Sequence, residues 1–189
     1  GAVVKWLRDE LRFITDSKDS EYFAKKVKSN GGVYVVPSFQ GLGAPYWDMR
    51  ARGAILGLTR GGGRDEIIRA ALESVAYRTD DVIKAMSRDM GKDIKTLKAD
   101  GGAAQNGFLM AFQADISDLS VVIPLSTEAT ALGAAMIAGL AVGFYGSKDE
   151  LIKKLTVKKT YAPAMGICER EELLKGWRAA VNAARAFKP

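Results

Sequence analysis

The sequence predicts an α/β fold. Strand-like and helix-like stretches alternate along the 189 residues, which is the pattern of a domain in which helices cover a sheet. The composition, 48% apolar and 26% charged, is ordinary for a globular protein, and a chain of this length suits one domain with a proper core. No internal repeat or low-complexity segment is evident, so repeat architectures are not favoured.

The first half of the chain predicts three helices and two strands. Helical spacing of apolar residues predicts an opening helix on Val3, Leu7, Leu11 and Ile14. A short helix over 19–28 should end at the glycines 31–32, and strands are expected over 33–36 and 54–58, separated by a loop over 38–52. A long helix over 65–90 should end at Gly91. Its buried stripe would consist of Ile68, Leu72, Val75, Val82 and Met86.

The second half predicts two more strands and three more helices. The strands are expected over 97–100 and 121–123, and the helices over 105–116, 130–140 and 169–187. Residues 129–147 carry no charge, but alanine and glycine dominate them, so we expect a buried helix packed by small residues rather than a membrane span. Thr127 could cap this helix. The last helix should face inward with Leu173, Leu174, Trp177, Val181 and Ala184.

Composition limits the chemistry. The chain has no histidine, which excludes histidine general bases, histidine metal ligands and Ser-His-Asp triads. Lysine and arginine outnumber acids by 28 to 22, giving +6, but they are spread along the chain and their densest clusters, 25–28 and 153–159, contain no interleaved aromatics. This favours solvated helix faces and loops over nucleic-acid binding. The single cysteine, Cys168, cannot form an internal disulfide and fits a reducing, cytoplasmic location.

The most chemically suggestive stretch is Asp100-Gly101-Gly102-Ala103, between a predicted strand and a predicted helix. Two glycines remove side chains where a ligand could approach the backbone, and the following helix would present free N–H groups and its positive end. Asn106 can both donate and accept hydrogen bonds. Tight strand–helix turns also use Gly-Gly for purely structural reasons, and the residues alone favour that interpretation.

Three further stretches stand out. The first runs from Gly41 to Gly53; it offers Asp48 and Arg52 as a charged pair, and Tyr46 and Trp47 could pin it to the core. In the second, 53–73, the acids Asp65 and Glu66 suit the positive end of the long helix. In the third, 127–135, small residues would allow close approach to a sheet.

Together the four stretches resemble the FGGY family of carbohydrate kinases, and the stretch 41–53 resembles the glycerol kinases within it. The resemblance covers residues 1 to about 187. It implies two ribonuclease-H-like (actin-like ATPase) domains with the active site between them, and residues 1–189 would form the C-terminal nucleotide-binding domain. The family transfers the γ-phosphoryl group of MgATP to a polyol, so the resemblance implies ATP and Mg²⁺ as cofactors and glycerol as the acceptor, giving glycerol 3-phosphate.

The resemblance also places nucleotide contacts at Gly1, Lys5, Gly102, Ala103 and Asn106. Gly102 and Ala103 would offer backbone, Asn106 would hydrogen-bond near the adenine, and Gly1 would allow close approach at the first helix. No catalytic residue is assigned. The catalytic aspartate, the polyol-binding domain, the phosphate loop and the opening strands are expected upstream of Gly1. The chain alone should therefore be inactive, with an exposed sheet edge.

Three positions depart from the family pattern. Lys5 stands where glycerol kinases commonly have glutamine and cannot accept a hydrogen bond, the glycines 61–63 should loosen a turn, and Ala129 replaces a threonine. Three alternatives stay open: a sister sugar kinase, a non-catalytic binding module and a basic nucleic-acid binder. Asp100 could meet magnesium through water or shape the turn. We also expect a homo-oligomer without a membrane span.

Overall fold

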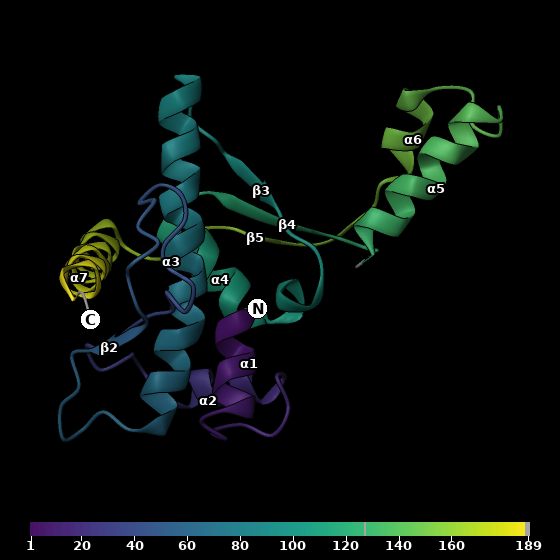
Figure 1. The fold of residues 1–189 in the computed structure, drawn as a ribbon. Coiled ribbons are helices and arrows are strands. Elements are labelled where there is room, and N and C mark those ends of the chain that lie inside the picture. Colours follow the sequence, from purple (N-terminus) through teal and green to yellow (C-terminus); the bar gives the residue numbers. More distant parts are fainter. Residues whose placement is uncertain (127, 188–189) are drawn as a thin grey trace.

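The structure is a computed structural model that describes residues 1–126 and 128–187. Helices and strands alternate around one long central helix (Figure 1). In chain order the elements are α1 (Ala2–Asp9), α2 (Asp19–Lys26), β1 (Tyr34–Val36), β2 (Ala54–Leu56), α3 (Arg64–Met90), β3 (Thr96–Lys98), the 3₁₀ helix η1 (Gly102–Gln105), α4 (Gly107–Ser117), β4 (Ser120–Pro124), α5 (Ala129–Ala141), α6 (Lys148–Lys154), β5 (Val157–Tyr161) and α7 (Ile167–Ala186).

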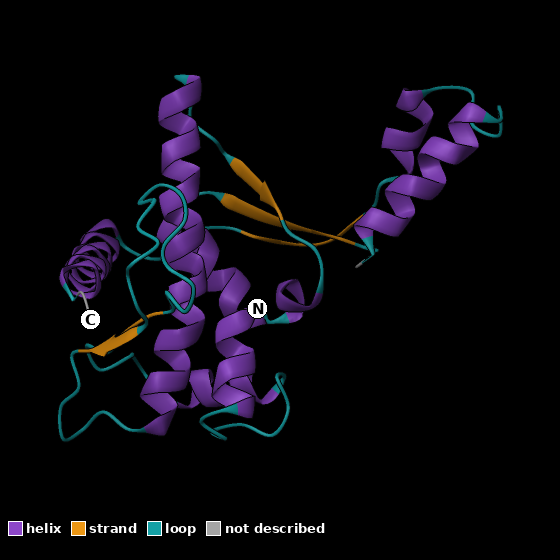
Figure 2. Ribbon diagram, viewed as in Figure 1, coloured by secondary structure: helices purple, strands orange, loops and turns teal. Residues whose placement is uncertain are grey.

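The strands form two small sheets on either side of α3 (Figure 2). β1 and β2 pair antiparallel, with Val35 opposite Ile55. In the other sheet β4 lies between β3, to which it is parallel, and β5, to which it is antiparallel. Among the described residues β3 and β5 are therefore the edge strands of this sheet.

The central helix α3 begins and ends where the sequence predicts. Glu66 accepts a hydrogen bond from the backbone N–H of Gly63 (2.9 Å), and Asp65 pairs with Lys26 (3.1 Å), so both acids stabilise the start of the helix as expected. Gly91 ends it in the left-handed conformation, at φ 62°.

The predicted buried stripe of α3 is correct only in its first half. Ile68 and Leu72 are buried, but Met86 is half exposed and Ile83 takes the inward position in the second half. The last turns of α3 extend beyond α4 (Figure 1).

The core around the middle of α3 is aromatic. Tyr77 of α3 stacks on Trp177 of α7, with ring centroids 5.2 Å apart, and meets the edge of Phe112 of α4. The indole Nε1 of Trp177 donates to Asp81 (3.0 Å) on the next turn of α3. Trp177 thus makes an apolar contact between α3 and α7, and its indole N–H has a hydrogen-bond acceptor there.

The same carboxylate anchors the loop 38–53. The hydroxyl of Tyr46 donates to Asp81 (3.1 Å), so Tyr46 pins the loop as predicted. The prediction for Trp47 was wrong, because its side chain is 75% exposed. Asp48 pairs with Arg185 of α7 (3.3 Å), while the guanidinium of Arg52 donates to backbone carbonyls of its own loop.

The opening helix is shorter in the structure than predicted. The opening helix ends at Asp9 instead of continuing to Ile14, because the chain turns through a left-handed residue at Arg12 (φ 55°). Ile14 still reaches the core, from the following loop. Apolar spacing therefore identified the buried residues but not the end of the helix.

The buried position predicted for residues 130–140 was wrong. α5 has no buried residue, its Ile137 is 72% exposed, and the α5–α6 pair projects from the end of the β3–β4–β5 sheet (Figure 1). Its small residues permit close packing but do not specify a packing partner. The capping role considered for Thr127 falls outside the described residues. No helix in the described residues is long and apolar enough to span a membrane.

Two tryptophans test the core. Trp177→Ala should destabilise the chain by about 3–5 kcal/mol, because a 1% exposed ring and its bond to Asp81 are lost. Trp47→Ala, the matched control, should cost less than about 0.5 kcal/mol. Urea unfolding followed by circular dichroism measures both, and equal losses would contradict the core described above.

Candidate functional site

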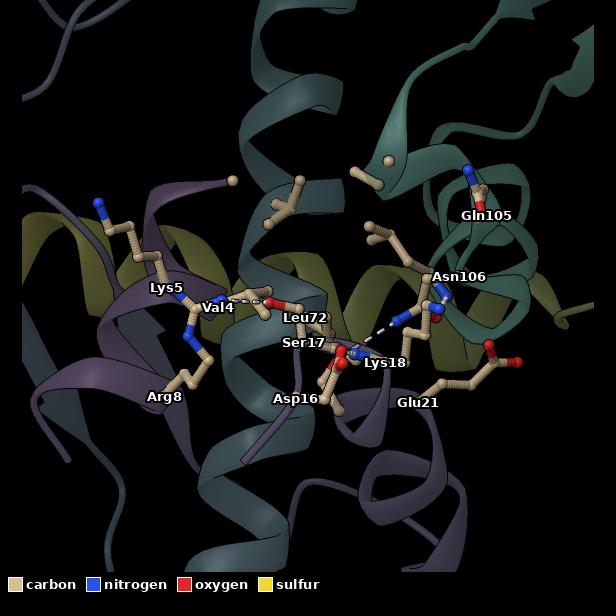
Figure 3. A pocket seen from close by; sticks show the side chains of 16 residues that line it. Val4, Lys5, Arg8, Asp16, Ser17, Lys18, Glu21, Leu72, Gln105 and Asn106 are labelled. Carbon is tan, nitrogen blue, oxygen red and sulfur yellow. Dashed lines mark hydrogen bonds between the residues drawn. The ribbon is translucent and has the colours of Figure 1, made fainter. Parts of the chain in front are cut away.

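A cavity of about 660 Å³ lies where α1, α2, η1 and the start of α4 meet the middle of α3 (Figure 3). This volume is typical of small-molecule sites. All five residues that the resemblance singled out line this cavity. Gly1 and Lys5 come from the start of the chain, and Gly102, Ala103 and Asn106 follow about 100 positions later. The fold therefore brings every predicted site residue to one place.

The floor of the cavity is apolar. Leu72 and Val75 come from α3, Val4 from α1 and Leu109 from the first turn of α4. Apolar side chains of this kind can cover the face of a planar ring, while polar groups on the rim fix its orientation. The arrangement suits a ligand with one flat apolar part and one polar part.

The Gly101–Gly102 turn forms one wall. Gly101 has φ 79°, a conformation that disfavours other residues, so the turn itself requires this glycine. Gly102 is different. In the described part of the chain, no atom other than those of its chain neighbours lies within 4 Å of the position that a Cβ would occupy there. The turn alone does not require glycine at position 102. Because Gly102 has no side chain, a ligand in the cavity can reach the backbone of this wall.

The start of α4 is not open in the way the sequence predicts. The helix begins at Gly107 instead of residue 105, and Asn106 caps it by accepting a hydrogen bond from the N–H of Leu109 (2.9 Å). Glu21 of α2 accepts a second bond from the N–H of Gly107 (3.1 Å). The expectation of free N–H groups at this end was therefore wrong for these two amides, because side chains of the protein already bind them.

Sequence reasoning missed the contribution of α2. Ser20 and Glu21 line the cavity beside Asn106, and the amide of Asn106 donates to the hydroxyl of Ser20 (3.4 Å). These residues lie 85 or more positions before Asn106. The pattern of α2 is that of an ordinary amphipathic helix, which carries no signal for this role.

Charge is distributed unevenly around the cavity. Burial alone would raise the pKa of Glu21, but Lys25 and the backbone N–H groups of Gly107 and Phe108 outweigh it and lower the pKa below its usual value. Glu21 is therefore a carboxylate at neutral pH. On the α1 wall, Lys5 makes no ion pair within the described residues, and Arg8 pairs with Asp9 (2.6 Å) while reaching Ser17 (3.5 Å).

Asp100 does not line this cavity. It borders a smaller one of about 180 Å³, with Lys158 and Lys159 of β5. No group of three or more Cys, Asp or Glu side chains suited to a metal ion occurs among residues 1–126 and 128–187. Asp100 is thus near the Gly101–Gly102 turn, but it is not part of an all-protein metal site there.

The fold and the cavity agree with the comparisons to known proteins. Residues 1–142 match the C-terminal domain of the FGGY family of carbohydrate kinases, and the chain therefore belongs to this family. A glycerol kinase of Clostridium botulinum (strain Alaska E43) is 60% identical over 187 residues, which are 99% of this chain and 38% of the relative. The chain spans somewhat more than a third of the length of such relatives.

Solved structures confirm the predicted actin-like ATPase fold. The glycerol kinase of Plasmodium falciparum, crystallised with ADP, superposes with a TM-score of 0.89 at 31% identity, over 97% of this chain and 37% of that chain. The gluconate kinase of Lactobacillus acidophilus gives 0.80 at 25% identity, over 100% and 39%. Kinases for different polyols and sugars thus share this fold.

The cap at Asn106 gives a test of the site. Asn106→Ala should cost about 1 kcal/mol, because the N–H of Leu109 loses its acceptor. Asn106→Asp keeps an acceptor at the same place and should retain the stability. Thermal and urea unfolding of both variants distinguish them. Equal losses would show that the cap does not stabilise α4.

Proposed function

We propose that this chain is the ATP-binding half of a kinase that transfers the γ-phosphoryl group of ATP to glycerol, giving glycerol 3-phosphate. One observation carries the proposal: the five residues implied by the family resemblance line a single cavity of suitable size. The relatives named as glycerol kinases support the choice of acceptor, since their identity extends over the whole chain. Residues 1–189 would then form the C-terminal nucleotide-binding domain.

In this proposal the cavity holds the nucleoside part of ATP. The apolar floor at Leu72 and Val75 would lie against the adenine, with Asn106 on the rim. The backbone at Gly102 and Ala103 would approach the ligand closely, since no side chain stands in the way. Phosphoryl transfer depends mainly on positioning and charge stabilisation, so holding the nucleotide in one orientation is a substantial part of the task.

Lys5 and Arg8 would face the anionic part of the nucleotide. A lysine can attract phosphate as a point charge, although it cannot replace the hydrogen-bond acceptor that glutamine would supply. The departure at position 5 is therefore compatible with binding, and it favours phosphate-bearing ligands over the nucleoside alone. Gly1 lies at the head of α1, where an added Cβ would meet no other atom of the described chain within 4 Å.

Mg²⁺ would enter with the nucleotide. The described residues do not form a metal site of their own, and Mg²⁺ in such kinases is commonly held by phosphate oxygens with one or two carboxylates. Asp100 is the carboxylate nearest in sequence to the Gly101–Gly102 turn and is the candidate for a water-mediated contact. Bound Mg²⁺ would neutralise charge on the transferred phosphoryl group. Assembly as a homo-oligomer and a cytoplasmic location stay predictions from the family resemblance.

Nucleotide binding is tested at the two glycines. Gly102→Ala should leave stability nearly unchanged and weaken MgADP binding about 10-fold or more, because the new methyl group points into open space that the ligand would fill. Isothermal titration calorimetry with the 189-residue chain gives the dissociation constants.

Gly101→Ala is the matched control. It should lower stability by about 1 kcal/mol, because φ 79° strains alanine. Unchanged MgADP affinity in a well-folded Gly102→Ala chain would exclude the proposed backbone contact.

A chimera tests the transfer reaction. In a chimera, the chain would replace the matching 187 residues of the Clostridium botulinum relative. We expect this chimera to phosphorylate glycerol with MgATP and the isolated chain to be inactive. A coupled assay with glycerol, pentuloses and hexonates as acceptors measures this. Turnover of a sugar instead of glycerol would reassign the substrate, and no turnover by a folded chimera that binds MgADP would support a non-catalytic module.

A further inference from the structure

Helix α4 points its start into the cavity, yet that end is occupied. A helix of this length normally offers free N–H groups and partial positive charge to an anion. Here the carboxylate of Glu21 accepts from Gly107, and the side chain of Asn106 accepts from Leu109. Two of the amides that could bind phosphate are therefore bound by the protein itself.

Glu21 is held in this position. It forms an ion pair with Lys25, one turn along α2, and its own helix is packed against both α3 and α4. Its neighbour Ser20 is buried and contacts the amide of Asn106 (3.4 Å). Figure 3 shows Glu21 and Asn106 on the same side of the cavity, with Lys5 and Arg8 across from them.

The two sides of the cavity therefore differ in the groups that they accept. A carboxylate accepts hydrogen bonds from neutral donors such as sugar hydroxyls or an exocyclic amine, and it repels phosphate. The opposite side carries Lys5, whose charge attracts phosphate, and Arg8, whose guanidinium is paired with Asp9 (2.6 Å). Asp16, Ser17 and Lys18 also line the cavity, between these two sides (Figure 3), and its floor is apolar.

We propose that Glu21 is a specificity-determining residue that orients the nucleotide: by closing the start of α4 it excludes phosphate there and reserves that side for the nucleoside. The inference rests on the proposed nucleotide site, and it adds a role for α2. Phosphate would then be directed toward α1 and the Gly102 backbone. The ligand could not bind in the reversed orientation without placing phosphate beside the Glu21 carboxylate.

The test compares three probes by calorimetry: inorganic pyrophosphate, adenosine and MgADP. In the Glu21→Ala chain the N–H of Gly107 is released and the charge is removed, so pyrophosphate should bind about 10-fold more tightly than to the original chain. Glu21→Gln removes the charge but keeps an acceptor for Gly107, so a smaller gain of about 3-fold is expected. Adenosine affinity should change less than 3-fold in the Gln variant.

Asp16→Asn is the matched control. It removes an equal charge from the wall of the same cavity, but Asp16 makes no hydrogen bond to α4 in the described residues; its side chain accepts from the N–H of Lys18 (2.9 Å). Its pyrophosphate affinity should rise less than 3-fold. An equal rise in Asp16→Asn and Glu21→Ala, or no rise in either Glu21 variant, would overturn the proposal.

The design separates this inference from the proposed function. If the original chain binds neither adenosine nor MgADP, the proposed function fails, while the pyrophosphate comparison still decides whether Glu21 closes α4. If Glu21→Ala does not fold by circular dichroism, Glu21→Gln decides, because its amide oxygen can still cap Gly107. In that case an unchanged pyrophosphate affinity in Glu21→Gln would reject the role of the charge.

Discussion

The buried middle of α3 is the constraint on which the rest of the structure depends. Residues from Ile68 to Ile83 contribute to both apolar clusters, the first shared with α1 and β1 and the second with α4 and α7. Val75 touches both clusters. Because one helix serves two cores, α1 and α4 are held at a fixed separation across its surface, and the cavity is the space left between them.

Polar side chains on α3 also fix the position of α2. The guanidinium of Arg69 donates to the carbonyl of Val27 (2.7 Å) and to Glu73 (2.8 Å), and Glu73 accepts from Asn30 (2.7 Å). Burial raises the pKa of Glu73, and the bonds from Arg69 and Asn30 oppose that rise. The network fixes the C-terminal end of α2, and the other end of that helix carries Ser20 and Glu21 to the cavity. A buried ion pair on α3 thus positions side chains that it does not touch.

Some residues of the candidate site are required by the fold, and others are not. Gly101 and the oxygen of Asn106 are required by the turn and by the start of α4, whatever the ligand. Gly102 and Lys5 have no comparable structural role in the described residues, and they are the positions at which ligand binding could be selected independently of folding. This separation explains why a Gly-Gly turn is ambiguous in the sequence and less ambiguous in the structure.

The sequence by itself determined the fold class and the bounds of α3, because a helix stop at Gly91 and acids at the start of α3 are local requirements of the backbone. The family and the five residues that line the cavity came from the resemblance of four sequence stretches to known kinases, since the residues alone left the Gly-Gly turn open to a structural interpretation. Only the tertiary structure decided that Glu21 occupies the start of α4, that Trp47 is exposed while Trp177 is buried, and that α5 projects from the sheet. Apolar periodicity indicates that a face can be buried, but the partner that covers it lies far away in the sequence and is fixed by the packing of the whole chain.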